Sequence, residues 1–248
     1  LMRNKHILLG VFFSLSLSFG QFSFREYLAT SIGFAQAVDM KDLDGDGDLD
    51  FVTSGSESNQ GKIFWYENDG AAIPTWAKRY IDSGNTARDV VIDDLDGDGH
   101  LDVISMNDHK GIQFYKNDGA SDPSFVSHWS AHKASDVENG KITIVDLDKD
   151  GDKDIIYPGG WLENNNDGSW SNQTTNTSWH LNMHVADIDN DGDLDIISTP
   201  HETRQLTVHL NDGAANPSWT EKEVFNTTQK TRMSVPVTAD IDNDGDMD

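Results

Sequence analysis

A nine-residue acidic segment that recurs five times constrains the fold of this chain more than any other sequence feature. The first copy, DLDGDGDLD, occupies residues 42–50, and the copies begin 52, 52, 41 and 53 residues apart. Every copy has Asp at positions 1, 3, 5 and 9 and Gly at position 6. Such a period predicts a repeat architecture. The other copies are DLDGDGHLD at 94–102, DLDKDGDKD at 146–154, DIDNDGDLD at 187–195 and DIDNDGDMD at 240–248.

The rest of each period predicts short β-strands. Each of the first four copies is followed by an aromatic or apolar stretch that ends in Asn-Asp-Gly, a turn signal because these residues tolerate φ > 0. After three of these turns comes Pro-x-aromatic, which begins a further strand. Four strands in roughly 50 residues predict an all-β fold, a β-propeller of four-stranded blades. Predicted strands include 90–93, 141–145 and 182–186 before the loops, 50–53, 102–105, 154–157 and 195–198 after them, 63–70, 112–119, 161–168 and 206–213 as third strands, and 76–81 and 219–224 as fourth strands.

The acidic loop has the composition of a metal site. Asp at positions 1, 3 and 5 places three carboxylates on one side of a tight loop, and Gly at position 6 permits the turn. Position 7 offers its backbone carbonyl, and Asp at position 9 closes the shell. Hard oxygen ligands in this number suit Ca²⁺ better than Mg²⁺ or Zn²⁺, so we predict about one Ca²⁺ per loop. The predicted ligands are Asp42, Asp44, Asp46, Asp48 and Asp50; Asp94, Asp96, Asp98, His100 and Asp102; Asp146, Asp148, Asp150, Asp152 and Asp154; Asp187, Asp189, Asp191, Asp193 and Asp195; and Asp240, Asp242, Asp244, Asp246 and Asp248.

Other acidic motifs fit the pattern less well. An EF-hand or dockerin needs a carboxylate at position 12 and a flanking helix, whereas position 12 here is Thr53, Ser105, Tyr157 or Ser198. Thrombospondin-like acidic repeats need cysteines, and the chain has none. A solvated acidic turn without a metal is the remaining alternative. The loops hold 24 of the 43 acidic residues, so the net charge of −25 belongs largely to the predicted metal sites.

The N-terminus predicts export. Arg3 and Lys5 precede an apolar run over 7–19, which is the layout of a signal peptide and too short to favour a spanning helix. We therefore expect a signal peptide over 1–20, a propeller region over 21–248, and a secreted or cell-surface protein with no membrane span after cleavage. The acidic net charge argues against a nucleic-acid partner, which requires a basic surface.

The repeat resembles the FG-GAP/VCBS repeat of bacterial exported proteins, which is related to the N-terminal propeller of integrin α-subunits. The resemblance covers residues 22–248 and rests on the acidic loop. It departs from the integrin type because no literal Gly-Ala-Pro follows the loop. It implies a seven-bladed propeller with a Ca²⁺ loop between the first and second strands of a blade. Because Asp248 is position 9 of the fifth loop, we expect the chain to be a C-terminally truncated fragment.

These features predict a calcium-stabilised scaffold for binding or cell adhesion, with a protein or glycan as ligand. The alternative is a calcium-dependent polysaccharide lyase or another glycan-acting propeller enzyme, because fold does not determine function. A lyase needs a base and a cation over the channel mouth, and His184 with Lys141 is the pair we propose for that case. A third option is a purely structural repeat.

Two groups of side chains are candidates for ligand contacts. Polar residues of the strand before each loop are expected to line the central channel, either hydrated or binding a small ligand. The aromatic residues of the third strands are expected to pack between blades rather than bind sugar. The first group is Asp39, Lys41, Asp89, Asp93, Lys141, Thr143, Asn182 and His184, and the second is Trp65, Tyr66, Tyr115 and Trp161.

Overall fold

The structure is a computed structural model. It describes residues 33–57, 60–84, 87–107, 111–131, 140–174, 182–199, 205–226, 236–242 and 247. The predicted signal peptide lies outside the described residues. No helix among the residues that the structure describes is long and apolar enough to cross a membrane.

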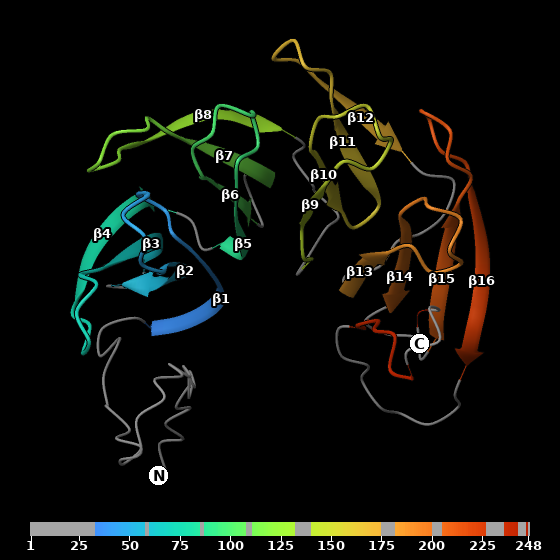
Figure 1. The fold of residues 1–248 in the computed structure, drawn as a ribbon, viewed down its shortest axis with the longest axis horizontal. Helices are drawn as coiled ribbons and strands as arrows, with labels where there is room; N and C mark the ends of the chain where they lie inside the picture. The colour runs from blue at the N-terminus through green and yellow to red at the C-terminus, as the bar shows by residue number, and fades with distance from the viewer. Residues whose placement is uncertain are drawn as a thin grey trace. The chain divides into compact units, whose positions relative to one another are not determined.

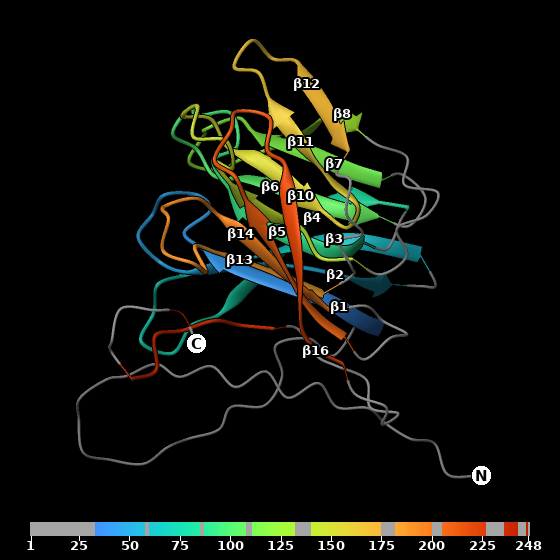
Figure 2. The ribbon, with the colours of Figure 1, turned by 90° about the vertical axis from the view of Figure 1, so that its right-hand side faces the viewer.

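The described chain forms four antiparallel sheets of four strands each, and within each sheet the strands lie side by side in chain order (Figures 1 and 2). These sheets are the predicted propeller blades, so the all-β prediction is confirmed. The blades are β1 (Gly33–Lys41), β2 (Asp50–Glu57), β3 (Gln60–Asn68) and β4 (Trp76–Ser83); β5 (Ala87–Asp93), β6 (Asp102–Asn107), β7 (Gly111–Asn117) and β8 (Phe125–Ala131); β9 (Thr143–Val145), β10 (Asp154–Tyr157), β11 (Gly160–Asn164) and β12 (Trp170–Thr174); and β13 (Asn182–Ala186), β14 (Asp195–Thr199), β15 (Gln205–Asn211) and β16 (Trp219–Asn226).

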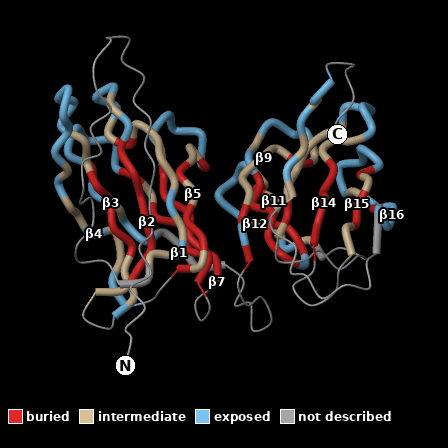
Figure 3. The backbone as a smooth tube through the Cα atoms, turned by 90° about the horizontal axis from the view of Figure 1, so that it is seen from below, coloured by how far each residue is buried: buried red, intermediate tan, exposed pale blue. Residues whose placement is uncertain are grey.

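Burial falls from the middle of each blade to its fourth strand (Figure 3). All six residues of β6 and all four of β10 are buried, whereas β4 has no buried residue. The second strands β6, β10 and β14 each contain two Val or Ile residues, as expected for strands buried on both faces. The third blade has no Pro-x-aromatic segment, yet Ser169 directly precedes Trp170 at the start of β12, so the proline is not needed for a fourth strand.

The hydrophobic core lies between consecutive blades. One cluster joins Val52 and Trp65 of the first blade to Ile92 and Tyr115 of the second. Similar clusters join the second blade to the third and the third to the fourth. The predicted packing of Trp65, Tyr115 and Trp161 between blades is therefore confirmed. Tyr66 is also buried, but it stacks on Phe51 of its own blade with the ring centroids 4.5 Å apart.

The aliphatic residue at position 2 of the first three loops is an anchor that the following blade covers. Leu43, Leu95 and Leu147 are each 2% exposed, and each belongs to a cluster that includes residues of the next blade. Ile188 is half-buried, and Ile241 is 76% exposed.

Candidate metal centres

Each acidic loop connects the first strand of a blade to the second, and its backbone nitrogens orient the carboxylates. In the first loop the nitrogen of Gly47 donates to Asp42 Oδ2 over 3.0 Å, and that of Asp48 donates to Asp46 Oδ1 over 2.9 Å. The same two bonds recur in the next three loops at 2.9 to 3.1 Å. Position 6 must be Gly, because its φ lies between 89° and 101° in all four loops.

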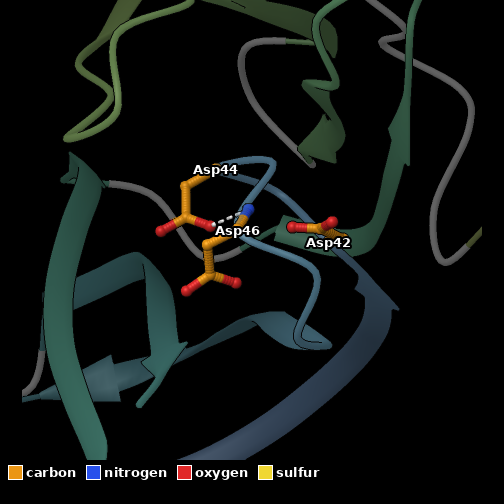
Figure 4. Close-up of side chains that lie close together, drawn as sticks. All are labelled: Asp42, Asp44 and Asp46. Carbon is orange, nitrogen blue, oxygen red and sulfur yellow. Dashed lines mark hydrogen bonds between the residues drawn. The ribbon is translucent and has the colours of Figure 1, made fainter. Parts of the chain in front are cut away.

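Three carboxylates converge in each of the four described loops. Figure 4 shows Asp42, Asp44 and Asp46 of the first loop, with the nitrogen of Asp46 donating to Asp44 Oδ1 over 3.2 Å. In each cluster one carboxylate oxygen from every member lies within 4.8 Å of the others. The remaining clusters combine positions 1, 3 and 9, namely Asp94, Asp96 and Asp102; Asp146, Asp148 and Asp154; and Asp187, Asp189 and Asp195.

The position-1 aspartates each present a carboxylate oxygen suited to a cation. The Oδ1 atom of this residue is buried and has no hydrogen-bond partner in any of the four loops. A buried carboxylate oxygen without a donor costs free energy, so such atoms are rare unless another group satisfies them. Every member of the cluster around this oxygen is an aspartate. Such an all-oxygen donor set fits a hard divalent cation. The four atoms are Asp42 Oδ1, Asp94 Oδ1, Asp146 Oδ1 and Asp187 Oδ1.

The position-9 aspartate is fully buried and joins the loop to the third strand. In the second loop Asp102 Oδ2 accepts from the nitrogen of Leu95 over 3.2 Å, and Asp102 Oδ1 accepts from that of Asn117 over 2.9 Å. The other three loops repeat both bonds. These bonds give the position-9 aspartate a structural role, and the sequence had predicted it as a metal ligand alone.

Burial sets the protonation behaviour of the position-9 carboxyls. Burial raises the pKa of Asp50 to about 6 and that of Asp102 and Asp154 to about 7, against the lowering effect of the backbone hydrogen bonds. The pKa of Asp195 is raised for the same reason. Nearby aspartates of the same loop add to the rise, as expected for like charges in a partly desolvated site. A bound cation would reverse this effect by favouring the ionised form.

In the first, second and fourth loops the side chain of position 7 lies at the turn glycine of the same blade. A Cβ atom placed on Gly70 would lie 2.0 Å from Asp48 Oδ2, and one on Gly119 would lie 2.4 Å from His100 Nε2. Position 7 belongs to none of the four carboxylate clusters of the described residues. This arrangement supports a carbonyl ligand at position 7, and it explains why His100 is compatible with the loop.

The Asn that begins the turn after each third strand is a structural residue that sequence reasoning missed; it belongs to Asn-Asp-Gly in three blades and is Asn164 in the third blade. Its side chain Nδ2 donates to a carbonyl of the acidic loop in its own blade, as from Asn117 to Leu101 O over 2.9 Å. Asn117 Nδ2 also donates to Leu43 O of the preceding blade over 3.1 Å. The turn Asp accepts from the hydroxyl of the residue before the aromatic, as Asp69 does from Thr75 over 2.6 Å. The recurrence of Asn at this place was the available signal.

The polar residues of the first strands connect blades. Asp39 Oδ2 accepts from the nitrogen of Ile92 over 2.7 Å, and Asp89 Oδ2 accepts from that of Ile142 over 2.9 Å. Each bond joins one blade to the next. These two carboxylates are therefore engaged in the interfaces between blades, rather than available to a channel ligand as the sequence had left open.

Asp93 is the centre of an ion-pair network across three blades. It pairs with Lys41 of the first blade over 3.1 Å and also with Lys153 of the third. Lys153 occupies position 8 of the third loop, where the other loops have Leu or Met. At this position Lys153 gains a partner in the preceding blade that the Leu or Met of the other loops could not bind.

The two residues suggested for a lyase have different neighbours. His184 Nε2 lies 3.1 Å from Thr238 Oγ1, while the exposed Lys141 acts electrostatically on Asp89. A buried Ser198–His209 pair, with Oγ and Nε2 2.9 Å apart, was not expected from the sequence. Both residues are 0% exposed, so this pair joins β14 to β15 within the sheet and is closed to a substrate.

The fifth loop is described in part. Asp240 and Asp242 are among the described residues, whereas Asp244, Asp246 and Asp248 lie outside them. Ligation by this loop therefore stays a prediction from the sequence.

An all-β chain with repeated four-stranded blades and an acidic loop in each blade defines a propeller-type repeat protein. The family model for the FG-GAP-like repeat matches residues 42–105, 94–157 and 187–248, which together make up more than half of the chain. The chain belongs to the FG-GAP-like repeat family. No curated protein matches it significantly.

A comparison with solved structures gives a distant likeness. The crystal structure of the V. cholerae biofilm matrix protein Bap1 matches with a TM-score of 0.40 and 16% sequence identity, over 76% of this chain and 38% of that chain. This chain thus corresponds to well under half of the length of Bap1.

Proposed function

We propose that this chain is an extracellular calcium-binding scaffold that presents its blades to a protein or glycan ligand. The calcium assignment rests on the Oδ1 atom of the position-1 aspartate. This atom is buried without a hydrogen-bond donor in four successive loops. In this proposal the carboxylates of positions 1, 3, 5 and 9 and the carbonyl of position 7 hold each Ca²⁺. The cation supplies the positive charge that offsets repulsion among the aspartates.

The expected role of Ca²⁺ is structural. Each loop fixes the start of a second strand, and its position-9 aspartate also bonds the third strand, so a filled loop stabilises the middle of its blade. Calcium sites of extracellular modules have dissociation constants of about 10⁻⁴ to 10⁻³ M, which suits an exported protein. The signal-peptide pattern of the N-terminus supports the same location.

The scaffold role rests on family membership and on which side chains are left exposed. The inner aspartates Asp39 and Asp89 are occupied by contacts between blades. By contrast, the fourth strands present Tyr80, Val126 and Val224, each more than half exposed. Exposed fourth strands and loops are therefore the surfaces that we assign to ligand contact.

Thermal melting with and without calcium tests the calcium assignment. We expect the chain stripped with EDTA to melt well below the calcium-saturated chain, because ligands that bind the folded state alone stabilise it by about 2.7 kcal/mol per site at 100 times the dissociation constant. Refilling with Mg²⁺ should restore much less stability than refilling with Ca²⁺. An unchanged melting temperature in excess EDTA would refute the proposal.

Binding assays test the scaffold role. The calcium-saturated chain is passed over immobilised polysaccharides and extracellular-matrix proteins, and the matched control is the same chain in EDTA. Retention on at least one surface that requires calcium is the expected result. Turnover of a polysaccharide without stable retention would instead point to an enzyme.

A further inference from the structure

The residue before the turn Asn changes charge from blade to blade, although its place in the fold is constant. In each blade the following Asn donates its backbone nitrogen to the position-9 aspartate, so the preceding residue lies at the same register next to the acidic loop. The four residues at this place are Glu67, Lys116, Glu163 and Leu210.

Lys116 reaches into the second loop. Its ammonium Nζ forms ion pairs with Asp96 and Asp98, the latter over 2.8 Å. These residues occupy positions 3 and 5, which are two of the predicted calcium ligands. All three side chains are about one-third exposed, so the contact lies at the rim of the site. The ammonium therefore neutralises the carboxylates that a cation would use.

The first and third loops have the opposite charge at this place. Glu67 acts electrostatically on Asp44, and Glu163 acts on Asp148, both of which are position-3 aspartates. The second loop also has His100 where the first has Asp48, so it has one carboxylate fewer. The formal charge of the residue before this Asn differs by two units between the first and second loops, although Glu67 is itself paired with Arg79 over 2.6 Å.

We propose that Lys116 supplies the positive charge of the second loop in place of a tightly bound Ca²⁺, which makes this loop a weaker calcium site than the first. This inference rests on the proposed calcium binding and deepens it, because it assigns different affinities to the first and second loops. It also makes the fold of the second blade less dependent on calcium than that of the first.

Calcium titration of Lys116 variants tests the inference. Isothermal titration calorimetry of the metal-stripped chain should show one binding constant that strengthens about tenfold or more in Lys116→Met, because a neighbouring positive charge opposes the cation. Lys116→Glu, which copies Glu67, should strengthen it about a hundredfold. Lys62→Met is the matched control, since Lys62 pairs with Glu57 rather than with a loop aspartate, and it should leave all constants unchanged.

A position-1 substitution assigns the altered constant to a loop. Asp94→Asn in the Lys116→Met background should abolish the gained strong site, whereas Asp42→Asn should abolish a different one. In the otherwise unaltered chain Asp94→Asn should leave the strong constants as they are. Melting in calcium shows that each variant is folded before it is titrated.

The outcomes separate this inference from the proposed function. If the chain binds calcium but Lys116→Met changes no constant, the inference is overturned and the calcium assignment stands. The inference is also overturned if Asp94→Asn removes a strong site while Lys116 is present. If calorimetry shows no calcium binding for the original chain, both the proposed function and this inference are wrong.

Discussion

Positions 4 and 6 of the acidic loop both have positive φ, but they accept different residues. Position 4 has φ between 59° and 77°, and it is Gly45, Gly97, Lys149 or Asn190. Position 6 has φ from 89° to 101° and is Gly in every copy. Values near 57° lie in the left-handed region that L-residues enter at a modest cost, whereas larger φ values suit Gly. The sequence pattern at position 4 therefore follows from backbone conformation.

Alanine substitutions at these two positions should differ in cost. No atom lies within 4 Å of an ideal Cβ at Gly45 or Gly47, so the loss reports on the backbone rather than on a clash. We expect Gly45→Ala to lower the free energy of unfolding by about 1 kcal/mol and Gly47→Ala by about 2 to 3 kcal/mol. Urea denaturation in saturating calcium measures both.

Gly45→Asn is the control for the backbone argument. Asn tolerates the left-handed region, as Asn190 does at the equivalent place, so this substitution should cost less than Gly45→Ala. Equal losses for Gly45→Ala and Gly47→Ala would contradict the assignment of position 6 to a glycine-only conformation.

The element that organises each blade is the loop together with the third strand, and the position-9 aspartate joins them. Asp50 is 0% exposed, and its two oxygens accept from the nitrogens of Leu43 and Asn68. Asp46 at position 5 is exposed and accepts one backbone bond, from Asp48. The two residues are both predicted calcium ligands, but only Asp50 is also part of the core of the blade.

Asparagine substitutions in the metal-stripped chain separate these roles. Asp50→Asn should cost about 2 to 3 kcal/mol, because the amide nitrogen faces a backbone donor in a buried position. Asp46→Asn should cost less than about 0.5 kcal/mol, because its Oδ1 still accepts the bond from Asp48 and the residue is exposed. Chemical denaturation in excess EDTA is the measurement. A small, equal loss for both variants would mean that position 9 acts through the metal alone.

The sequence was sufficient for the parts of the fold that are local. The period, the second strands and the acidic loop depend on neighbouring residues, so their patterns can be read directly. Contacts between copies were not predictable in this way. The bond from Asn117 to Leu43 O and the pair of Lys153 with Asp93 depend on which residues of consecutive blades meet, and a single repeat does not contain that information.

At the scale of the whole molecule, the interfaces between blades combine apolar clusters with polar bonds. The Asp39 carboxylate and the Lys41–Asp93–Lys153 network lie on the first-strand side, while Tyr115 and Trp161 belong to the clusters of the middle strands. Repeat proteins of this kind derive stability from each unit and from contacts with its neighbours. When a change acts on every loop, its effects on stability should therefore add up over the blades.

Protonation of the position-9 carboxyls is such a change, because their pKa is raised in every described loop. The pKa is about 6 for Asp50 and about 7 for Asp102 and Asp154, against 3.8 for an ordinary Asp. In the metal-stripped chain the folded state thus binds these protons more strongly than the unfolded state does. The contribution of these carboxyls to stability is therefore largest below about pH 4 and is lost as the pH rises through 7, by on the order of 1 to 2 kcal/mol per residue after solvent screening.

Calcium should reverse this dependence, because the cation is held by the ionised carboxylates and protons compete with it. Melting temperatures between pH 4.5 and pH 7.5 should therefore fall with pH in the stripped chain and rise with pH in saturating calcium. The turn aspartates Asp69, Asp118 and Asp212 do not disturb this window, because hydrogen bonds to neighbouring hydroxyls lower their pKa and their contribution is lost only at lower pH. If the stripped chain instead becomes more stable from pH 4.5 to pH 7.5, the buried carboxyls are not the groups that make calcium necessary.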